Sequence, residues 1–187
     1  MKKVLILACS YRVGGNSDTM AQWALEAAEQ AGAQAELVAL RDKNISPCTA
    51  CDACAKTGRC IIKDDGEQVF QKLLEADCVI FCAPVNFYSF GAMPKALIDR
   101  AQFLWTGKSA IQAANKHDRS VYLLACGGQK FKDNFDCMEK ILQCFSLSLE
   151  AKYQGGVFFR GIDAKGDINQ QANRQQVMDA VRIWSKI

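Results

Sequence analysis

Four of the thirteen residues from 48 to 60 are cysteines, in the sequence CTACDACAKTGRC. They form the spacing Cys-x2-Cys-x2-Cys-x5-Cys at Cys48, Cys51, Cys54 and Cys60. Thiolates are ligands for zinc and for iron–sulfur clusters, and neighbouring thiols can also form a redox switch. Four states of this segment are therefore open: an iron–sulfur cluster, a zinc ion, a thiol redox switch, or structural thiols that bind nothing.

The spacing favours a cluster over zinc. A tetrahedral zinc site often uses two Cys-x2-Cys pairs that lie far apart in sequence, whereas only two residues separate Cys51 from Cys54. A [4Fe–4S] cubane is larger than a zinc ion, and a Cys-x2-Cys-x2-Cys loop can reach three of its corners. Residues 56–59 give the chain the slack for Cys60 to return as the fourth ligand. The negative charge of a cluster would be offset by the basic residues of the segment, Lys56, Arg59 and Lys63.

The chain contains ten cysteines, and the other six lie within apolar stretches. A high cysteine count in a short secreted chain indicates a disulfide framework, but this chain has 187 residues, of which 50% are hydrophobic. A reducing, cytoplasmic location fits it better. The six are then predicted to be small buried apolar residues: Cys9, Cys78, Cys82, Cys126, Cys137 and Cys144.

Charge and hydropathy exclude two other classes of partner. The net charge is +3, with no basic block to follow a phosphate backbone, so no nucleic-acid partner is expected. The first residues, MKKVLILACS, imitate a signal peptide, but their apolar run of about six residues is shorter than the roughly 7–15 of such a segment. No stretch approaches the ~20 apolar residues of a membrane span, so we expect a soluble protein without a membrane partner.

Apolar runs alternate with segments of helical periodicity along the chain. Strands are predicted at 4–9, 35–40, 78–84, 120–126 and 155–162, and helices at 18–31, 67–76, 93–104, 133–147 and 168–186. This alternation predicts a parallel sheet with helices on both faces. Five strands favour an α/β fold of the flavodoxin-like type, a three-layer sandwich with strand order 2-1-3-4-5. We predict a single domain over residues 1–187, with a cysteine-rich connection at about 41–66.

The loop after the first strand, CSYRVGGNSDTM at 9–20, has the composition of a phosphate site. Open α/β sheets bind ligands beyond the carboxyl ends of their strands, and here a helix N-terminus follows the loop. It lacks the G-x-G-x-x-G and Lys-Ser/Thr patterns, which favours the phosphate of FMN over a dinucleotide or ATP. The candidate binding residues are Ser10, Arg12, Gly15, Asn16, Ser17 and Thr19. The alternative is a plain turn in which Asn16 or Ser17 caps the helix.

Two further loops follow the third and fourth strands. Aromatic and apolar side chains beside amide and hydroxyl groups would cover a flat isoalloxazine ring and bond its polar edge, although apolar residues there could equally belong to the core. The candidates in the first of these loops are Pro84, Val85, Asn86, Phe87, Tyr88 and Ser89. In the second they are Cys126, Gly127 and Gly128, where glycine would let the backbone approach the ring closely.

Over about the first 130 residues, these motifs resemble the NADPH-dependent FMN reductase branch of flavodoxin-like proteins. The first loop is similar to the family motif Gly-Ser-Pro-Arg-x-x-Gly-Asn-Ser/Thr, matched by Ser10, Arg12, Gly15, Asn16 and Ser17. The second is similar to Pro-Val-Tyr-Phe…Lys-Ala-x-x-Asp-Arg, matched by Pro84, Val85, Phe87, Lys95, Ala96, Asp99 and Arg100. The cysteine run, followed by IIKDDG, resembles the iron–sulfur flavoprotein subgroup, whose compact four-cysteine motif holds a [4Fe–4S] cluster. Three positions depart from the family: Cys9, Tyr11 and Asn86 replace glycine, proline and tyrosine.

The resemblance implies an FMN-dependent oxidoreductase that transfers electrons between a [4Fe–4S] cluster and FMN. It implies a homodimer or homotetramer, a ferredoxin-like protein or NAD(P)H as electron donor, and a small-molecule electron acceptor. One alternative is an NAD(P)H-dependent FMN or quinone reductase without a cluster, and another is a non-catalytic flavin- or zinc-binding module. Hydride transfer to FMN needs no acid or base, so no catalytic side chain is predicted and His117 is expected at the surface.

Several other residues have structural interpretations. The Asp64-Asp65-Gly66 sequence is predicted to form a turn and cap before the helix at 67–76. Trp105 is predicted to lie in the core or at a dimer contact. Lys95, Asp99 and Arg100 either form ion pairs on a helix surface or cross a subunit interface.

Overall fold

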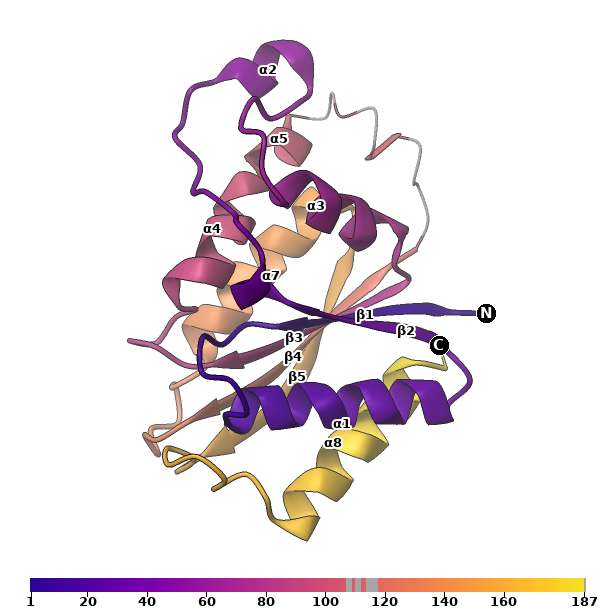
Figure 1. Cartoon of the computed structure of the whole chain (residues 1–187), viewed down its shortest axis with the longest axis vertical. Helices are drawn as coiled ribbons and strands as arrows, with labels where there is room; N and C mark the ends of the chain where they lie inside the picture. The colour runs from indigo at the N-terminus through magenta and orange to yellow at the C-terminus, as the bar shows by residue number, and fades with distance from the viewer. Residues whose placement is uncertain (107–108, 110–111, 114–117, 187) are drawn as a thin grey trace.

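A computed structural model describes residues 1–106, 109, 112–113 and 118–186 of the chain (Figure 1). His117, predicted to be a surface residue, lies outside the described residues.

The sheet has five parallel strands in the order β2-β1-β3-β4-β5, which confirms the predicted fold and strand order. Its strands are β1 (Lys3–Ala8), β2 (Gln34–Ala39), β3 (Cys78–Pro84), β4 (Ser120–Gly127) and β5 (Lys152–Arg160). β3 has the predicted bounds, and β5 begins three residues earlier than predicted.

Helices cover both faces of the sheet. They are α1 (Asn16–Gln30), α3 (Gly66–Glu75), α4 (Ala92–Arg100), α5 (Gln102–Trp105), α7 (Asp136–Ser148) and α8 (Gln171–Trp184). α1 and α8 lie on one face, and α3, α4, α5 and α7 on the other (Figure 1). The single helix predicted at 93–104 is two helices. They are separated at Ala101, whose N–H donates to the carbonyl of Ile98, three residues earlier, as in a 3₁₀ turn. The short 3₁₀ helix η1 (Leu40–Asp42) and helix α2 (Ala53–Thr57) were not predicted.

The central strands are buried on both faces, because their alternate side chains enter two apolar layers. Leu7 and Phe81 pack in the layer under α3, α4 and α7, while Ile6 and Ile80 pack in the layer against α1 and α8. Burying one such side chain stabilises the fold by about 1.5–3 kcal/mol. The sandwich therefore holds the ends of β1, β3 and β4 in fixed positions.

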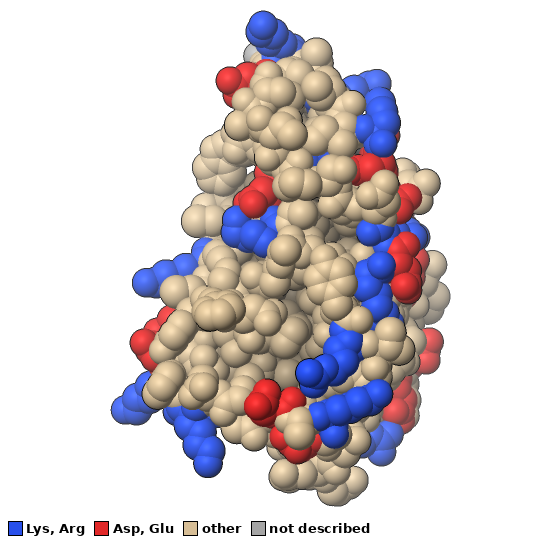
Figure 2. All heavy atoms as spheres, turned by 60° about the vertical axis from the view of Figure 1, so that its left-hand side comes forward, with Lys and Arg blue, Asp and Glu red and all other residues tan. Residues whose placement is uncertain are grey.

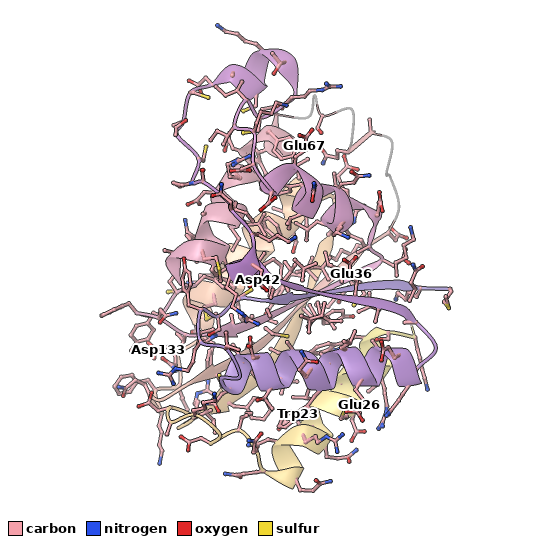
Figure 3. The ribbon with its side chains drawn as sticks, viewed as in Figure 1. Trp23, Glu26, Glu36, Asp42, Glu67 and Asp133 are labelled. Atoms are coloured by element: carbon pink, nitrogen blue, oxygen red, sulfur yellow. The ribbon has the colours of Figure 1, made fainter. Side chains whose placement is uncertain are left out.

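α1 and α8 pack side by side, and a surface ion pair joins them. Arg174 of α8 lies 2.8 Å from the carboxylate of Glu26, which Figure 3 shows with Trp23 on the side of α1 toward α8. Both charged side chains are partly exposed, so this pair stabilises little. The apolar layer beneath it carries the contact between the two helices.

The prediction of six buried cysteines holds for four of them and is wrong for two. Cys9, Cys78, Cys82 and Cys126 are buried, whereas Cys137 and Cys144 are exposed on α7. The buried face of α7 carries Met138, Leu142 and Phe145 instead. Cys137 and Cys144 are seven residues apart and therefore share the outer face.

This difference predicts two classes of thiol in the native protein. Burial raises the pKa of Cys78 to about 12 and also raises the pKa values of Cys9 and Cys82 well above the ordinary value of a thiol. Because the thiolate is the reactive form, we expect an alkylating reagent to modify these three at least about 100-fold more slowly than Cys137. Mass spectrometry of peptides from a time course measures the rates, with the protein in urea as the control. Equal rates in the native protein would contradict the burial described here.

Candidate functional site

A cavity of about 300 Å³ lies at the carboxyl ends of β1, β3 and β4, within the size range of small-molecule sites. Figure 2 brings this side of the molecule forward and shows a hollowed, largely uncharged face with Lys and Arg side chains at its edges. Eleven of the predicted cofactor residues line the cavity: Ser10, Arg12, Gly15, Asn16, Ser17, Pro84, Val85, Asn86, Cys126, Gly127 and Gly128.

The first loop curls back on itself over this cavity. The Cys9 N–H donates to the carbonyl of Cys82, which carries the end of β1 against β3. The Ser10 hydroxyl oxygen accepts from the backbone N–H of Arg12 at 3.1 Å, and the Arg12 carbonyl accepts from Gly15 at 3.2 Å. These bonds leave the Ser10 hydroxyl hydrogen available to a ligand.

The N-terminus of α1 is free to bind an anion. The N-cap is Gly15, and no described side chain caps the helix, so the alternative in which Asn16 or Ser17 caps it is wrong. The carboxylate of Asp18 turns aside to accept from the Gly14 N–H at 2.9 Å and from Arg41 at 2.8 Å. The N–H groups of the first turn have no hydrogen-bond partner among the described residues, and with the helix dipole they favour a phosphate at this position.

Asn16 has a different role from the other predicted phosphate residues. Its side-chain amide donates to the carbonyl of Ala164 at 2.9 Å, and its oxygen accepts from the N–H of Gly166 at 3.0 Å. Asn16 thus braces the first loop against the loop after β5. Thr19 lies outside the cavity lining, because its hydroxyl donates to the carbonyl of Gly15 within the helix.

Phe87, Tyr88 and Ser89 also lie outside the cavity lining. Two backbone hydrogen bonds of 2.9 Å close a tight turn between Asn86 and Ser89. Phe87 and Tyr88 both have positive φ, 48° and 62°, and this turn directs the fully exposed Phe87 outward. Tyr88 stacks on Phe131 with an angle of 5° between the rings. The turn therefore places aromatic rings outside the cavity instead of in its walls.

The end of β4 requires glycine. A Cβ at Gly127 would lie 2.2 Å from Cγ1 of Val85, so any other residue would force apart two walls of the cavity. Cys126, which precedes Gly127, lies in the same cavity wall. Burial raises the pKa of its thiol to about 12, so the thiol stays neutral.

Five lining residues were not predicted: Cys9, Tyr11, Gly91, Ile162 and Asp163. Ile162 and Asp163 follow β5, and the Ile162 N–H donates to the carbonyl of Gly127. Their position at the end of the strand predicted at 155–162 was the available signal, since parallel strands end at the same edge of a sheet.

The cysteine loop forms a second, smaller cavity of about 30 Å³, lined by Cys48, Cys51, Cys54 and Cys60. Cys54 and Cys60 also pack against the apolar core. Among the described residues, no three His, Cys, Asp or Glu side chains are arranged to hold a single metal ion. The loop thus brings the four predicted thiols around one small cavity.

Metal binding at this loop depends on whether its cysteines are thiols or thiolates. Burial, together with the nearby thiols of Cys48 and Cys60, raises the pKa of Cys54 even though backbone hydrogen bonds oppose the shift. Metals bind thiolates, so binding at this loop would release protons.

A buried ion pair clamps the cysteine loop to α4. Arg100 lies 2.8 Å from the carboxylate of Asp64, and the two side chains are only 2% and 3% exposed. Arg100 also donates to the carbonyls of Ser46 and Ile62, at 3.1 and 3.3 Å. Asp64 accepts from the N–H groups of Ser46 and Gly66. The clamp thus grips the loop on both sides of its cysteines.

This clamp bears on two predictions, the turn and cap at Asp64 and the surface ion pairs that included Arg100. Asp64 does bond the first residue of α3, as expected of a turn and cap, but its charged partner is Arg100. Arg100 is not part of a surface ion pair, whereas Lys95 and Asp99 form the predicted one at 2.6 Å. Trp105 is 58% exposed and lines a groove between α4–α5 and α7 instead of the core.

The fold and the strand-end cavity, with a free helix N-terminus beside it, define a class: flavodoxin-like proteins that use FMN. The chain belongs to the NADPH-dependent FMN reductase family, whose sequence profile matches residues 2–158. Its family is thus one of FMN-dependent oxidoreductases. No helix among the described residues is both long and apolar enough to cross a membrane.

Individual proteins agree with this placement. An iron–sulfur flavoprotein of Methanocaldococcus jannaschii is 35% identical over 130 residues, which are 68% of this chain and 66% of that protein. The match thus spans just under two thirds of that relative. A second iron–sulfur flavoprotein of the same organism is 34% identical over 87% of this chain and 80% of its own length. The solved NAD(P)H:quinone oxidoreductase from Methanothermobacter marburgensis shares the fold, with a TM-score of 0.72, 17% identity, and coverage of 99% of this chain and 98% of that one.

The close approach at the end of β4 predicts the effect of one methyl group on FMN binding. We expect Gly127→Ala to weaken FMN binding at least about tenfold, because the new Cβ collides with Val85 and displaces a cavity wall. Quenching of flavin fluorescence during titration measures the affinity. The double variant Gly127→Ala/Val85→Ala, compared with Val85→Ala alone, should recover part of the loss. Unchanged affinity in Gly127→Ala would contradict this geometry.

The clamp predicts how stability depends on pH. Burial alone would raise the pKa of Asp64, but hydrogen bonds from Arg100, Ser46 and Gly66 outweigh it and place the pKa below its ordinary 3.8. The ionised carboxylate therefore stabilises the fold above pH 3.8, and this contribution is lost as pH falls through the lower folded value. We expect Asp64→Asn to reduce the free energy of unfolding by about 3 kcal/mol at pH 7, and by progressively less below pH 3.8.

Urea unfolding at pH 7, 5 and below measures this difference. Asp99→Asn is the matched control, because it removes a partly exposed carboxylate from the surface pair with Lys95. A loss in Asp64→Asn as small as the loss in this control would show that the clamp contributes no stability.

Proposed function

We propose that this protein is an electron-transferring iron–sulfur flavoprotein, with FMN in the strand-end cavity and a [4Fe–4S] cluster on the cysteine loop. One observation carries the proposal: all four cysteines of the compact motif line a single cavity, in a loop that a buried ion pair fixes to the fold. The names of the two M. jannaschii relatives support it.

In this proposal each group at the strand ends has a distinct task. The Ser10 and Ser17 hydroxyls, Arg12 and the free N–H groups of α1 bind the FMN phosphate. Asn16 keeps their loop in place. Val85 and the glycines Gly127 and Gly128 line the space for the ring. FMN, when bound, supplies redox chemistry in one-electron or two-electron steps.

Cys48, Cys51, Cys54 and Cys60 would hold the cluster, which supplies single electrons when bound. A one-electron donor such as a ferredoxin-like protein suits this arrangement, with a small molecule as the acceptor at the flavin. We place the protein in the cytoplasm, where its thiols stay reduced.

A homodimer or homotetramer completes the proposal. Figure 1 shows α2 at the upper end of the molecule, while the strand-end loops lie at its left side. A partner subunit could bring its flavin to this cysteine loop. The groove between α4–α5 and α7, about 540 Å³ and bordered by the exposed Trp105, offers an apolar surface for such a contact.

A second candidate is an NAD(P)H-dependent FMN or quinone reductase that uses no cluster. The family description, which names NADPH, favours it. Hydride transfer between stacked rings would then need an open face of the flavin, and the exposed Phe87 follows the cavity-lining Asn86 in the same turn. Rapid oxidation of NAD(P)H by a Cys48→Ser variant would favour this candidate. Membership in an enzyme family disfavours the third alternative, a non-catalytic binding module.

Anaerobic reconstitution with iron and sulfide tests the proposal. We expect about four irons and four sulfides per chain, with broad absorption near ~400 nm beyond that of flavin. Cys54→Ser should lower the iron content and the absorption, whereas the matched control Cys137→Ser, an exposed cysteine outside the loop, should change neither. Zinc, iron and sulfide are counted in the same samples. Protein that binds FMN but retains no iron, or only zinc, would contradict the cluster.

A further inference from the structure

Arg100 has more hydrogen-bonding capacity than the clamp uses. Its two terminal nitrogens donate to Asp64, Ser46 and Ile62. The fifth N–H donor of the guanidinium, on Nε, is buried and has no partner among the described residues. A buried donor without a partner costs about 1–3 kcal/mol, so its retention indicates a group that the protein binds.

The position of Arg100 identifies where that group would lie. Arg100 is 98% buried and contributes to the walls of two small cavities, one of which all four cysteines line and the other of which Cys60 also borders. Ile62 and Phe103 contribute apolar surface to the cavity of the four cysteines. Thr49, Asp52 and Gln102 also border this cavity, and its four cysteines supply sulfur acceptors.

The charge of Arg100 also matters there. In the clamp, Asp64 neutralises the positive charge of Arg100. The main contribution of the guanidinium to the cavity is therefore the dipole of one N–H group, and its net charge contributes less. A hydrogen bond to a cluster sulfur stabilises the more negative, reduced state of the cluster and thereby raises its reduction potential.

We propose that Arg100 is a positioning residue for the cluster, which it serves in two ways. Through Asp64, Ser46 and Ile62 it holds the cysteine loop closed, and through Nε it donates a hydrogen bond to a cluster sulfide or a ligating cysteine sulfur. This inference rests on the proposed cluster and adds a residue that tunes its potential.

Arg100→Lys separates the two tasks. Lysine keeps a positive charge for Asp64 but has a methylene where arginine has Nε, so the sulfur loses its donor. We expect the reconstituted variant to have a lower cluster reduction potential than the wild type in a redox titration followed by electron paramagnetic resonance. Arg59→Lys is the matched control, because Arg59 is an exposed arginine of the same loop that does not line the thiol cavity. Its potential should equal that of the wild type.

A second measurement needs no variant and covers the case in which Arg100→Lys assembles no cluster. Wild-type protein labelled with ¹⁵N-arginine should show, in pulsed electron paramagnetic resonance of the reduced cluster, a ¹⁵N coupling that Arg59→Lys retains. Absence of this coupling, or an Arg100→Lys potential equal to that of the wild type, overturns the inference but leaves the cluster in place. A wild-type protein that binds no iron overturns both, and the iron count distinguishes the two failures.

Discussion

Parallel pairing of β1, β3 and β4 is the constraint on which the strand-end site depends. The register sets Ala8 beside Cys82 and Pro84 beside Cys126, so three loops from distant parts of the chain begin at one edge of the sheet. Both faces of these strands are buried, which makes a slip of one residue costly. The core therefore fixes the places where the loop after β1, the loop at Val85 and the turn at Gly127 begin.

The cysteine loop depends on a different kind of interaction. It is polar, its longest helix is the five-residue α2, and it places few side chains in the core. The Asp64–Arg100 pair compensates by joining both arms of the loop to α4. Removing one partner of a buried pair costs about 3–5 kcal/mol, because the other charge is left without compensation. The loop can thus hold its thiols around one cavity without a core of its own.

The sequence allowed the fold to be predicted because its strands are compact apolar runs between helical segments. The apolar runs VLILAC and CVIFCAP are short and lack helical periodicity, which is typical of buried strands. The cavity lies at their carboxyl ends, where the sequence predicted a ligand site. The turn at Phe87 and Tyr88 could not be predicted, since it uses two aromatic residues at positive φ where glycine or asparagine usually signals a turn. The Asp64–Arg100 clamp joins residues 36 positions apart, and nothing local to either residue indicates that contact. Cys137 and Cys144 were misplaced because a helix in a half-apolar segment can present either face to the sheet.

The most direct test of the account is the difference in affinity between FMN and riboflavin for the flavin-free protein, measured by isothermal titration calorimetry. The two ligands share the ring and differ in the phosphate, which the account assigns to Ser10, Ser17, Arg12 and the N-terminus of α1. The account predicts one FMN per chain and riboflavin binding at least about tenfold weaker, or ~1.4 kcal/mol. Equal affinities, or no binding of FMN, would contradict a phosphate site at the end of β1.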